Sequence, residues 1–291
     1  MASSSSSLNT DKHTIDLIFL RKEVSQLAEQ VASFISKEAQ DFNKDDIEVK
    51  SFNSLVSYVD KEAEKKIVAR LRELLPQAGI IAEEGTGTPK EEGFNWIIDP
   101  LDGTTNFVHG IPVYSISIAL SHTEKMEEEE STQTELLLGI VYEVNRKECF
   151  AAHKNGGATL NGKKIKVSGE KELGKSLLAT GFPYEDFERI EDYLSMMETM
   201  MKAAHGLRRL GSAAVDLSFV AAGRFEGYFE YNLNAWDVAA GALIVTEAGG
   251  IVSDFEGNQI VENYIFGKQI IAATDIHSQI LELVKKVFLN K

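Results

Sequence analysis

The segment WIIDPLDGTTNF sets two carboxylates directly after an apolar run that is typical of a buried strand. Asp99 stands where that strand is expected to end, because Pro100 has no N–H to donate to a sheet. Asp102 follows in a turn with Gly103. Two carboxylates that leave a strand end together can bind a hard divalent cation through their oxygens.

The residues after the aspartates favour phosphate binding. Thr104 and Thr105 offer a helix N-cap, and the first N–H groups of a helix have no partner within it and bind phosphate. The segment therefore predicts a site that holds a phosphate ester against Mg²⁺. The alternative is a capped turn in which Asp99 and Asp102 bind local N–H groups. Two aspartates alone favour that alternative, whereas the whole segment is far more specific.

A second apolar run ends in acids in the same way, at Glu83 and Glu84. If this strand lies beside the one that ends at Asp99, Glu83 arrives next to Asp99. Taken alone, a pair of glutamates is more typical of solvated surface.

A further acid lies in the segment NAWDVAAGA. Asn234 is expected to cap a helix, and Asp237 then occupies the third helical position, where a capping box uses an acid. That role explains Asp237 structurally and also leaves its carboxylate at the helix mouth, where it could share a metal. The small residues 239–242 indicate close packing against another element.

Hydrophobic periodicity predicts the elements that must position these groups. Helical spacing predicts helices over residues 14–42, 60–75 (with Asp60 as its N-cap), 190–204, 212–222, 236–248 and 276–289. Apolar runs predict strands over residues 79–82, 94–98, 114–120, 136–142, 148–152, 176–180, 227–231, 250–253 and 269–272. The acidic residues 124–135 are expected to form a hairpin loop. The first half is α+β with antiparallel character, the second half is α/β-like, and we expect a site between them.

Composition narrows the class of protein. The 291 residues carry a net charge of −15, which disfavours nucleic-acid and anionic membrane surfaces, while a bound metal keeps a small anionic substrate possible. No run approaches the roughly 20 apolar residues of a membrane span. Residues 1–13 have no apolar core and are expected to be a disordered tail. The single cysteine, Cys149, is expected to be a buried filler, and a cytoplasmic location fits it.

Two other stretches could bind an anion, but each is more typical of a structural or surface feature. The stretch GEKELGKS matches a phosphate-binding loop pattern, but an apolar strand-like run follows it where a helix is required, so we expect a charged turn. The pair Arg208 and Arg209 could attract an anion, yet an interface or surface role is preferred.

The segments IIDPLDGTTNF and WDVAAGALIVTEAGG together resemble the two signatures of the inositol monophosphatase family. The resemblance covers about residues 15–285. It implies a layered αβαβα sandwich of the inositol monophosphatase and fructose-1,6-bisphosphatase type, with an α+β lobe over about residues 14–168 and an α/β lobe over about 169–291. A third segment, KSFNSLVSYVD, also resembles the family, although Ser54 and Ser57 stand where the family commonly has Asp and Thr.

The resemblance implies roles for particular residues. Two or three Mg²⁺ ions are expected on Glu83, Asp99, the carbonyl of Leu101, Asp102 and Asp237. Glu83 and Thr104 are expected to orient the attacking water, with Asp60 supporting Thr104. Substrate contacts are expected from Asp102, Gly103, Thr104, Ala213, Glu230 and Asp237.

The implied activity is lithium-sensitive, Mg²⁺-dependent hydrolysis of a polyol phosphate monoester by metal-activated water, with inositol monophosphate as the first candidate. The family also implies a homodimer and a small phosphate ester as partner. The acidic charge adds the expectation of no nucleic acid and no membrane, and the single cysteine adds that of a cytoplasmic location. Fructose bisphosphate and adenosine bisphosphate remain alternative substrates. A non-catalytic binding protein on the same fold is the alternative from another class.

Overall fold

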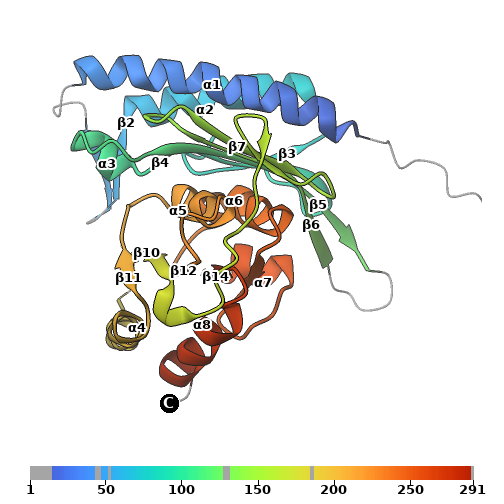
Figure 1. The fold of residues 1–291 in the computed structure, drawn as a ribbon. Helices are drawn as coiled ribbons and strands as arrows, with labels where there is room; N and C mark the ends of the chain where they lie inside the picture. The colour runs from blue at the N-terminus through green and yellow to red at the C-terminus, as the bar shows by residue number, and fades with distance from the viewer. Residues whose placement is uncertain (1–14, 43–46, 52–53, 127–131, 184–186, 290–291) are drawn as a thin grey trace, which may run out of the picture.

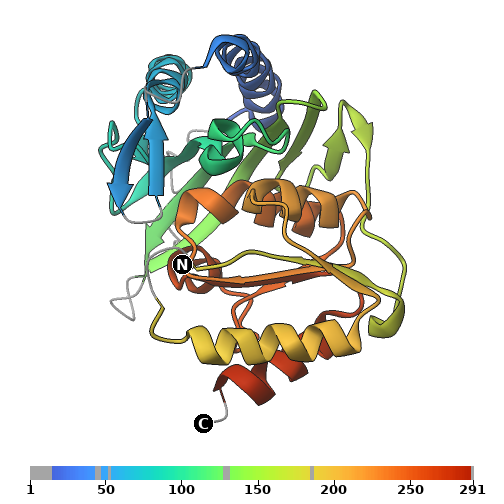
Figure 2. The same ribbon diagram turned by 90° about the vertical axis from the view of Figure 1, so that its left-hand side faces the viewer.

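Two β-sheets alternate with three layers of helices in the computed structural model (Figures 1 and 2). It describes residues 15–42, 47–51, 54–126, 132–183 and 187–289, so the tail predicted over residues 1–13 lies outside the described residues. The layers run α1 and α2, the larger sheet, α5 and α6, the smaller sheet, and finally α4 and α8. The predicted αβαβα sandwich is therefore confirmed.

The larger sheet has seven strands in the order β3-β4-β5-β6-β7-β8-β9, and only its β3–β4 pair is parallel. Its strands are β3 (Gly79–Ala82), β4 (Gly93–Asp102), β5 (Ser115–Lys125), β6 (Thr132–Glu143), β7 (Glu148–His153), β8 (Ala158–Leu160) and β9 (Lys163–Lys164). A separate antiparallel pair joins β1 (Ile47–Ser51) and β2 (Ser54–Ser57).

The smaller sheet has five strands in the order β11-β10-β12-β14-β13 and mixes parallel with antiparallel pairs. Its strands are β10 (Leu177–Thr180), β11 (Gly206–Arg208), β12 (Gly227–Tyr231), β13 (Ile251–Ser253) and β14 (Gln269–Ala273). A 3₁₀ turn over Leu173–Lys175 precedes β10. The charged turn before a strand is therefore confirmed, and the stretch GEKELGKS does not lead into a helix.

The helices are α1 (Leu17–Asp41), α2 (Tyr58–Leu74), α3 (Thr104–Val108), α4 (Ile190–Ala203), α5 (Ala213–Ala221), α6 (Ala235–Glu247), α7 (Val261–Phe266) and α8 (His277–Val284), followed by a π-helical turn over Lys285–Leu289. Among these described helices, each is too short or too polar to cross a membrane.

Helices α5 and α6 fill the space between the two sheets and are buried along most of their surface. A helix that is apolar all round belongs in such a layer. Small residues let the layers approach: a Cβ on Gly139 of β6 would lie 2.6 Å from the carbonyl oxygen of Ala240, and one on Gly241 would lie 2.6 Å from Leu217. The close packing expected for residues 239–242 is confirmed.

Several predicted boundaries differ from the structure. Helix α2 begins two residues earlier than predicted, and Asp60 is not its N-cap. Ser57 caps the helix, and Asp60 at the third position completes the capping box. Strand β4 does not stop before Pro100: it runs to Asp102, with a register shift against β5 between Asp99 and Asp102 that accommodates the proline. No ranges were predicted for strands β1, β2, β8, β9 and β11 or for helix α7.

Candidate functional site

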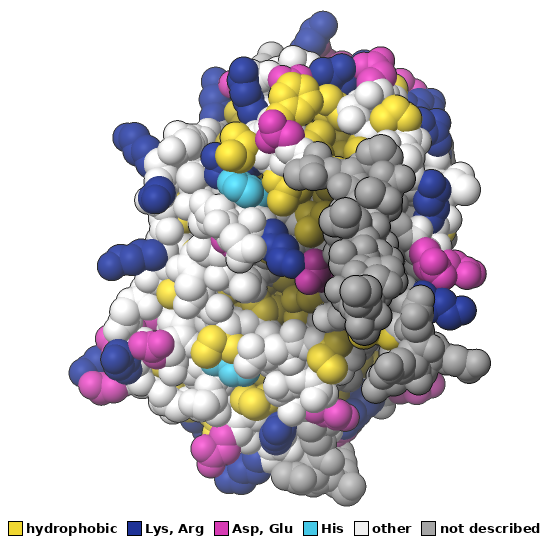
Figure 3. Space-filling model, turned by 90° about the vertical axis from the view of Figure 1, so that its right-hand side faces the viewer, with side chains coloured by type: hydrophobic (Ala, Val, Ile, Leu, Met, Phe, Trp, Pro, Cys, Tyr) yellow, Lys and Arg dark blue, Asp and Glu magenta, His cyan; other side chains and the backbone are white. Residues whose placement is uncertain are grey.

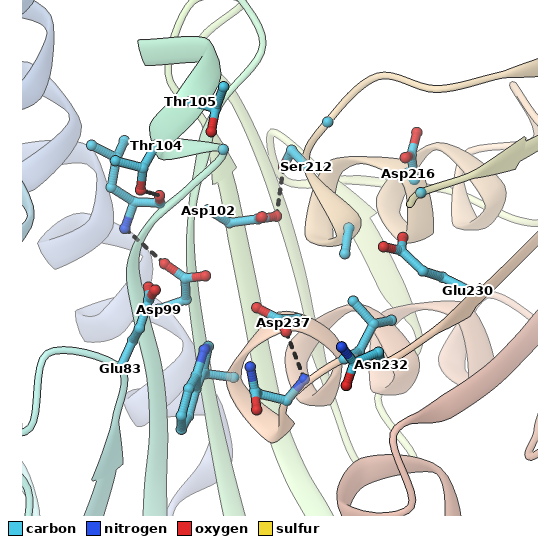
Figure 4. A pocket seen from close by; sticks show the side chains of 18 of the residues that line it. Glu83, Asp99, Asp102, Thr104, Thr105, Ser212, Asp216, Glu230, Asn232 and Asp237 are labelled. Atoms are coloured by element: carbon cyan, nitrogen blue, oxygen red, sulfur yellow. Dashed lines mark hydrogen bonds between the residues drawn. The ribbon is translucent and has the colours of Figure 1, made fainter. Parts of the chain in front are cut away.

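A pocket of about 360 Å³ opens where the ends of β3, β4 and β12 meet the N-termini of α3, α5 and α6 (Figure 4). Most of its lining comes from acids, glycines and hydroxyl or amide side chains. The lining includes all but one of the residues that the sequence assigned to the site, namely Glu83, Asp99, Leu101, Asp102, Gly103, Thr104, Ala213, Glu230 and Asp237. The exception, Asp60, lies behind Thr104 and is hydrogen-bonded to it.

The two aspartates of the first motif are held by different elements. Asp99 is buried, and its Oδ1 accepts a hydrogen bond of 2.9 Å from the backbone N–H of Leu101. Asp102 reaches across to α5: its Oδ2 accepts from the Ser212 hydroxyl at 2.6 Å and from the Ala214 N–H at 2.8 Å. Asp102 therefore links the motif to the helix layer between the sheets.

The third aspartate comes from the start of α6. Asn234 and Asp237 form the predicted capping box, in which Asp237 Oδ2 accepts from the Asn234 N–H at 2.7 Å. One carboxylate oxygen from each of Asp99, Asp102 and Asp237 lies within 4.8 Å of the other two. All these donors are oxygens, so the set suits a hard cation such as Mg²⁺.

Glu83 arrives beside this cluster by strand pairing. Strands β3 and β4 run parallel with Ala82 opposite Ile98, and the Glu83 N–H donates to the Ile98 carbonyl at 3.2 Å. Glu83 directly follows Ala82, and Asp99 directly follows Ile98. The prediction that Glu83 lies next to Asp99 is therefore confirmed. Figure 4 shows both carboxylates on the same side of the pocket.

Burial and mutual repulsion raise the pKa values of these acids. Desolvation, followed by the charges of Glu83, Asp102 and Asp237, raises the pKa of Asp99 well above its ordinary value. Desolvation raises the pKa of Asp102 to about 6 against the hydrogen bonds from Ser212 and Ala214. A bound cation would reverse this repulsion.

A chain of hydrogen bonds fixes the hydroxyl of Thr104. Its Oγ1 lies 2.8 Å from Asp60 Oδ1 and 3.1 Å from the Leu101 carbonyl oxygen. The other Asp60 oxygen accepts from the N–H of Ser57 at 2.8 Å and from its hydroxyl at 2.6 Å. Gly103 precedes α3 with φ 98°, a left-handed conformation that favours glycine. The sequence had suggested that Thr104 or Thr105 caps α3. In the structure Gly103 is the N-cap, and the two threonines are the first residues of the helix.

Glu230 stands at the other end of the pocket, on β12. The Tyr228 hydroxyl donates to Glu230 Oε2, because residues two apart on a strand share a face. Gly181 packs against the same carboxylate: a Cβ there would lie 1.9 Å from Glu230 Oε1. Desolvation raises the pKa of Glu230 to about 7, against the Tyr228 hydrogen bond and the charge of Arg209.

Comparison with known proteins identifies the family. The model of the inositol monophosphatase family matches residues 18–288. The chain is a member of this family. Among its relatives, the Nus factor SuhB of Pseudomonas aeruginosa is 42% identical over 214 residues, which cover 72% of this chain and 75% of that protein. The inositol-1-monophosphatase of Mesorhizobium japonicum is 35% identical over 263 residues, which cover 90% and 94%.

The fold agrees with a solved structure of a relative. The crystal structure of the extragenic suppressor protein suhB from Bartonella henselae is 34% identical, superposes with a TM-score of 0.81, and covers 92% of this chain and 99% of that chain. The family resemblance stated from the sequence is therefore confirmed, while the names of the relatives do not fix a substrate.

The pocket of this inositol monophosphatase family member also contains residues that the sequence did not assign to it: Arg209, Asp216, Asn232 and Lys268. Of the pair for which an interface or surface role was preferred, Arg208 is exposed, whereas Arg209 is half-buried and lines the pocket. Asp216 is almost completely buried, its Oδ1 has no hydrogen-bond partner, and desolvation with the charges of Glu230 and Asp102 raises its pKa. Positive φ values at Asn232 and Lys268 mark the turns that bring both residues to the pocket. No local sequence pattern identified Asp216, Asn232 or Lys268, and the only signal for Arg209 was the arginine pair.

Proposed function

We propose that this chain is a Mg²⁺-dependent phosphatase that hydrolyses a phosphate monoester of a polyol, with inositol monophosphate as the first candidate. One observation carries the proposal. Three carboxylates from two distant segments, Asp99, Asp102 and Asp237, converge at one end of a pocket of about 360 Å³ in a member of the inositol monophosphatase family. A volume of this size suits a small ester.

The proposed metal ligands are Asp99, Asp102 and Asp237, completed by Glu83 and the carbonyl of Leu101, for two or three Mg²⁺ ions. When bound, Mg²⁺ neutralises phosphate charge, acidifies water and stabilises the leaving oxygen. The oxygen-only donor set and the raised pKa values of the acids support the assignment, because a buried acidic cluster gains most from a divalent cation.

We assign Glu83 and Thr104 to the attacking water. The Thr104 hydroxyl lies 2.8 Å from Asp60 Oδ1, so its proton can be donated to Asp60 while its lone pairs accept from a water. Asp60 is in turn fixed by Ser57 through two hydrogen bonds. Glu83 would accept the proton of the water as it attacks in line with the leaving oxygen.

The remaining proposed contacts hold the substrate. The backbone N–H groups of Gly103 and Thr104 would bind the phosphate oxygens, and Asp102 and Asp237 would lie beside the ester oxygen. Glu230 would accept a hydrogen bond from a hydroxyl of the leaving polyol, and the backbone of Ala213 would contact the same ring. The buried Glu230 carboxylate, oriented by Tyr228, supports a hydroxyl-bearing leaving group over an apolar one.

A phosphate-release assay tests this proposal. Inositol 1-phosphate, fructose 1,6-bisphosphate and adenosine 3′,5′-bisphosphate are compared by kcat/KM with Mg²⁺, then with Li⁺ added. The proposal predicts Mg²⁺-dependent release that Li⁺ inhibits and that is fastest with the inositol ester. If another ester is hydrolysed fastest, the proposed phosphatase reaction stands and the proposed substrate is replaced by that ester. No release from any ester would contradict the proposal. Lithium sensitivity, a homodimer and a cytoplasmic location belong to the same proposal.

A non-catalytic role is the second candidate, because the relatives named Nus factor SuhB reach 42% identity. Among the described side chains on the face in Figure 3, basic and acidic groups are interspersed, which gives that face no large basic patch. The expectation of no nucleic-acid partner rests on charge alone, and the Nus factor names leave it untested. A cellular function that survives Asp99→Asn would favour this second candidate.

A further inference from the structure

Helix α2 carries two buried acids one turn apart, Asp60 and Glu64, on the side that faces the pocket segments. Asp60 holds Thr104, as described above. Glu64 has no assigned role. Buried carboxylates are expensive unless their oxygens are hydrogen-bonded, so the partners of Glu64 are informative.

Glu64 binds the loop that carries Glu83. Its Oε2 accepts from the backbone N–H of Glu84 at 2.8 Å. Its Oε1 accepts from the N–H of Thr86 at 3.0 Å and from the Thr86 hydroxyl at 2.7 Å. Three donors on one fully buried carboxylate form a charge-assisted anchor for the residue next to Glu83.

The loop over residues 84–88 folds back along β3, and its two glycines permit this path. Gly85 has φ 81°, and a Cβ on Gly87 would lie 2.4 Å from the Ile80 carbonyl oxygen. The Ile80 N–H donates to the Thr88 carbonyl at 3.0 Å. The tip of the loop is thus tied to α2 through side-chain oxygens, while its base is tied to β3 and β4.

We propose that Glu64 is a positioning residue, which sets the place of Glu83 relative to the metal cluster by anchoring the Glu84–Thr86 loop to α2. The inference rests on the proposed function. One helix then holds both residues that are proposed to orient the attacking water: Thr104 through Asp60, and Glu83 through Glu64. The spacing of one helical turn fixes the distance between the two supports.

The variant Glu64→Gln tests the inference. An amide has only one acceptor oxygen, so its NH₂ group must face at least one of the loop donors, and the anchor loosens. We expect the Mg²⁺ dissociation constant, measured by calorimetry without substrate, to rise about 10–100-fold, as for other residues that support metal ligands. The rate at saturating Mg²⁺ is expected to fall much less. Glu62→Gln, an exposed acid on the same helix, is the control and should bind Mg²⁺ like the wild type.

Two further variants distinguish a loosened loop from a folding defect in Glu64→Gln. Thr86→Val removes one donor from the exposed loop side without touching α2. We expect the dissociation constant to rise roughly fivefold, less than a hydrogen bond to a charged group is worth, because the two backbone N–H donors still hold the loop. Glu64→Asp keeps both acceptor oxygens on a shorter side chain and should fall between the wild type and Glu64→Gln.

Wild-type Mg²⁺ affinity in both Glu64→Gln and Thr86→Val would overturn the inference and leave the proposed function intact. A wild-type chain that binds no Mg²⁺ would overturn both. A lower rate of Glu64→Gln at saturating Mg²⁺ with unchanged affinity would also overturn the inference, because a displaced Glu83 must weaken the metal site.

Discussion

The two ends of the pocket differ in the charges that surround their buried acids. At the proposed metal end, formed by Glu83, Asp99, Asp102 and Asp237, the neighbouring charges that act most strongly on Asp99 are carboxylates, and they raise its pKa. At the proposed substrate end, around Glu230, desolvation raises the pKa of Glu230, while the Tyr228 hydrogen bond and the charge of Arg209 lower it. In the proposed function, a cation from solution neutralises the carboxylates around Asp99, whereas Glu230 is influenced by a positive charge of the chain itself, that of Arg209. This difference predicts which variants affect metal binding and which affect substrate choice.

Asp99→Asn should break the metal end most severely. Loss of one carboxylate from the cluster is expected to lower kcat/KM by at least about a hundredfold, since the remaining acids hold the cation poorly. The measurement is phosphate release from inositol 1-phosphate. Asp275→Asn, an exposed acid outside the pocket, is the control and should leave the rate unchanged. Near-normal turnover by Asp99→Asn would count against the assignment of the cluster.

The pH dependence of stability should differ between the two ends. Without metal, Asp102 has a folded pKa of about 6 against 3.8, and Glu230 about 7 against 4.5. Both folded values are raised, so each group stabilises the fold fully below its unfolded pKa, and that contribution is lost as the pH rises through the folded value. We expect the free energy of unfolding in EDTA to fall by a few kcal/mol between about pH 4 and pH 8.

Mg²⁺ and one substitution separate the two contributions. Saturating Mg²⁺ should remove the part of this fall that comes from Asp102 and its neighbouring carboxylates. Glu230→Gln should remove the part that occurs between about pH 4.5 and pH 7. Denaturant titrations at several pH values provide the measurement. A metal-free protein whose stability increases from pH 5 to pH 8 would show that these carboxylates are not destabilised by burial.

Glu230→Gln should spare the metal end and change substrate choice. The amide accepts poorly from a polyol hydroxyl, and we expect KM for inositol 1-phosphate to rise about tenfold, the value of one hydrogen bond to a charged group. Hydrolysis of p-nitrophenyl phosphate, whose leaving group offers no hydroxyl, should change little. Equal losses with both esters would contradict the separation of the two ends.

Tyr228→Phe should have the smallest effect. It removes the hydroxyl that orients Glu230 and keeps the carboxylate itself. We expect KM for inositol 1-phosphate to rise about threefold, because a rotatable carboxylate still finds its partner part of the time. Steady-state kinetics at saturating Mg²⁺ measure this change, and the metal affinity should match that of the wild type. An effect larger than that of Glu230→Gln would mean that Tyr228 contacts the substrate directly.

The metal end could be predicted from the sequence because its geometry is local. Asp99, Asp102 and Thr104 lie within six residues. The capping rules placed Asp237 at a helix start, and the family resemblance placed it with the other two aspartates. Glu83 needed one assumption, that two similar apolar strands are neighbours, and the pairing of β3 with β4 confirms it. The fold layers followed from the family resemblance.

At the substrate end, the family resemblance supplied Glu230 and Ala213. Arg209, Asp216, Asn232 and Lys268 could not be assigned, because they come from separate segments with no shared pattern. Lys268 reaches the pocket through the antiparallel pairing of β12 with β14, and Arg209 through the connection from β11 to α5. A pair of arginines looks the same in sequence on a surface and beside a pocket. Asp60 was misassigned as a cap because Ser57 and Asp60 both favour helix starts, and only the hydrogen bonds distinguish them.

The central claim is that Asp99, Asp102 and Asp237 form a binding site for a divalent cation. Crystals of the chain soaked in MnCl₂ test it most directly, since the anomalous scattering of Mn²⁺ locates the ion without reference to activity. The account predicts at least one anomalous peak about 2–2.5 Å from carboxylate oxygens of these three residues, typical of hard-cation ligation. An anomalous map with no peak among them would contradict it.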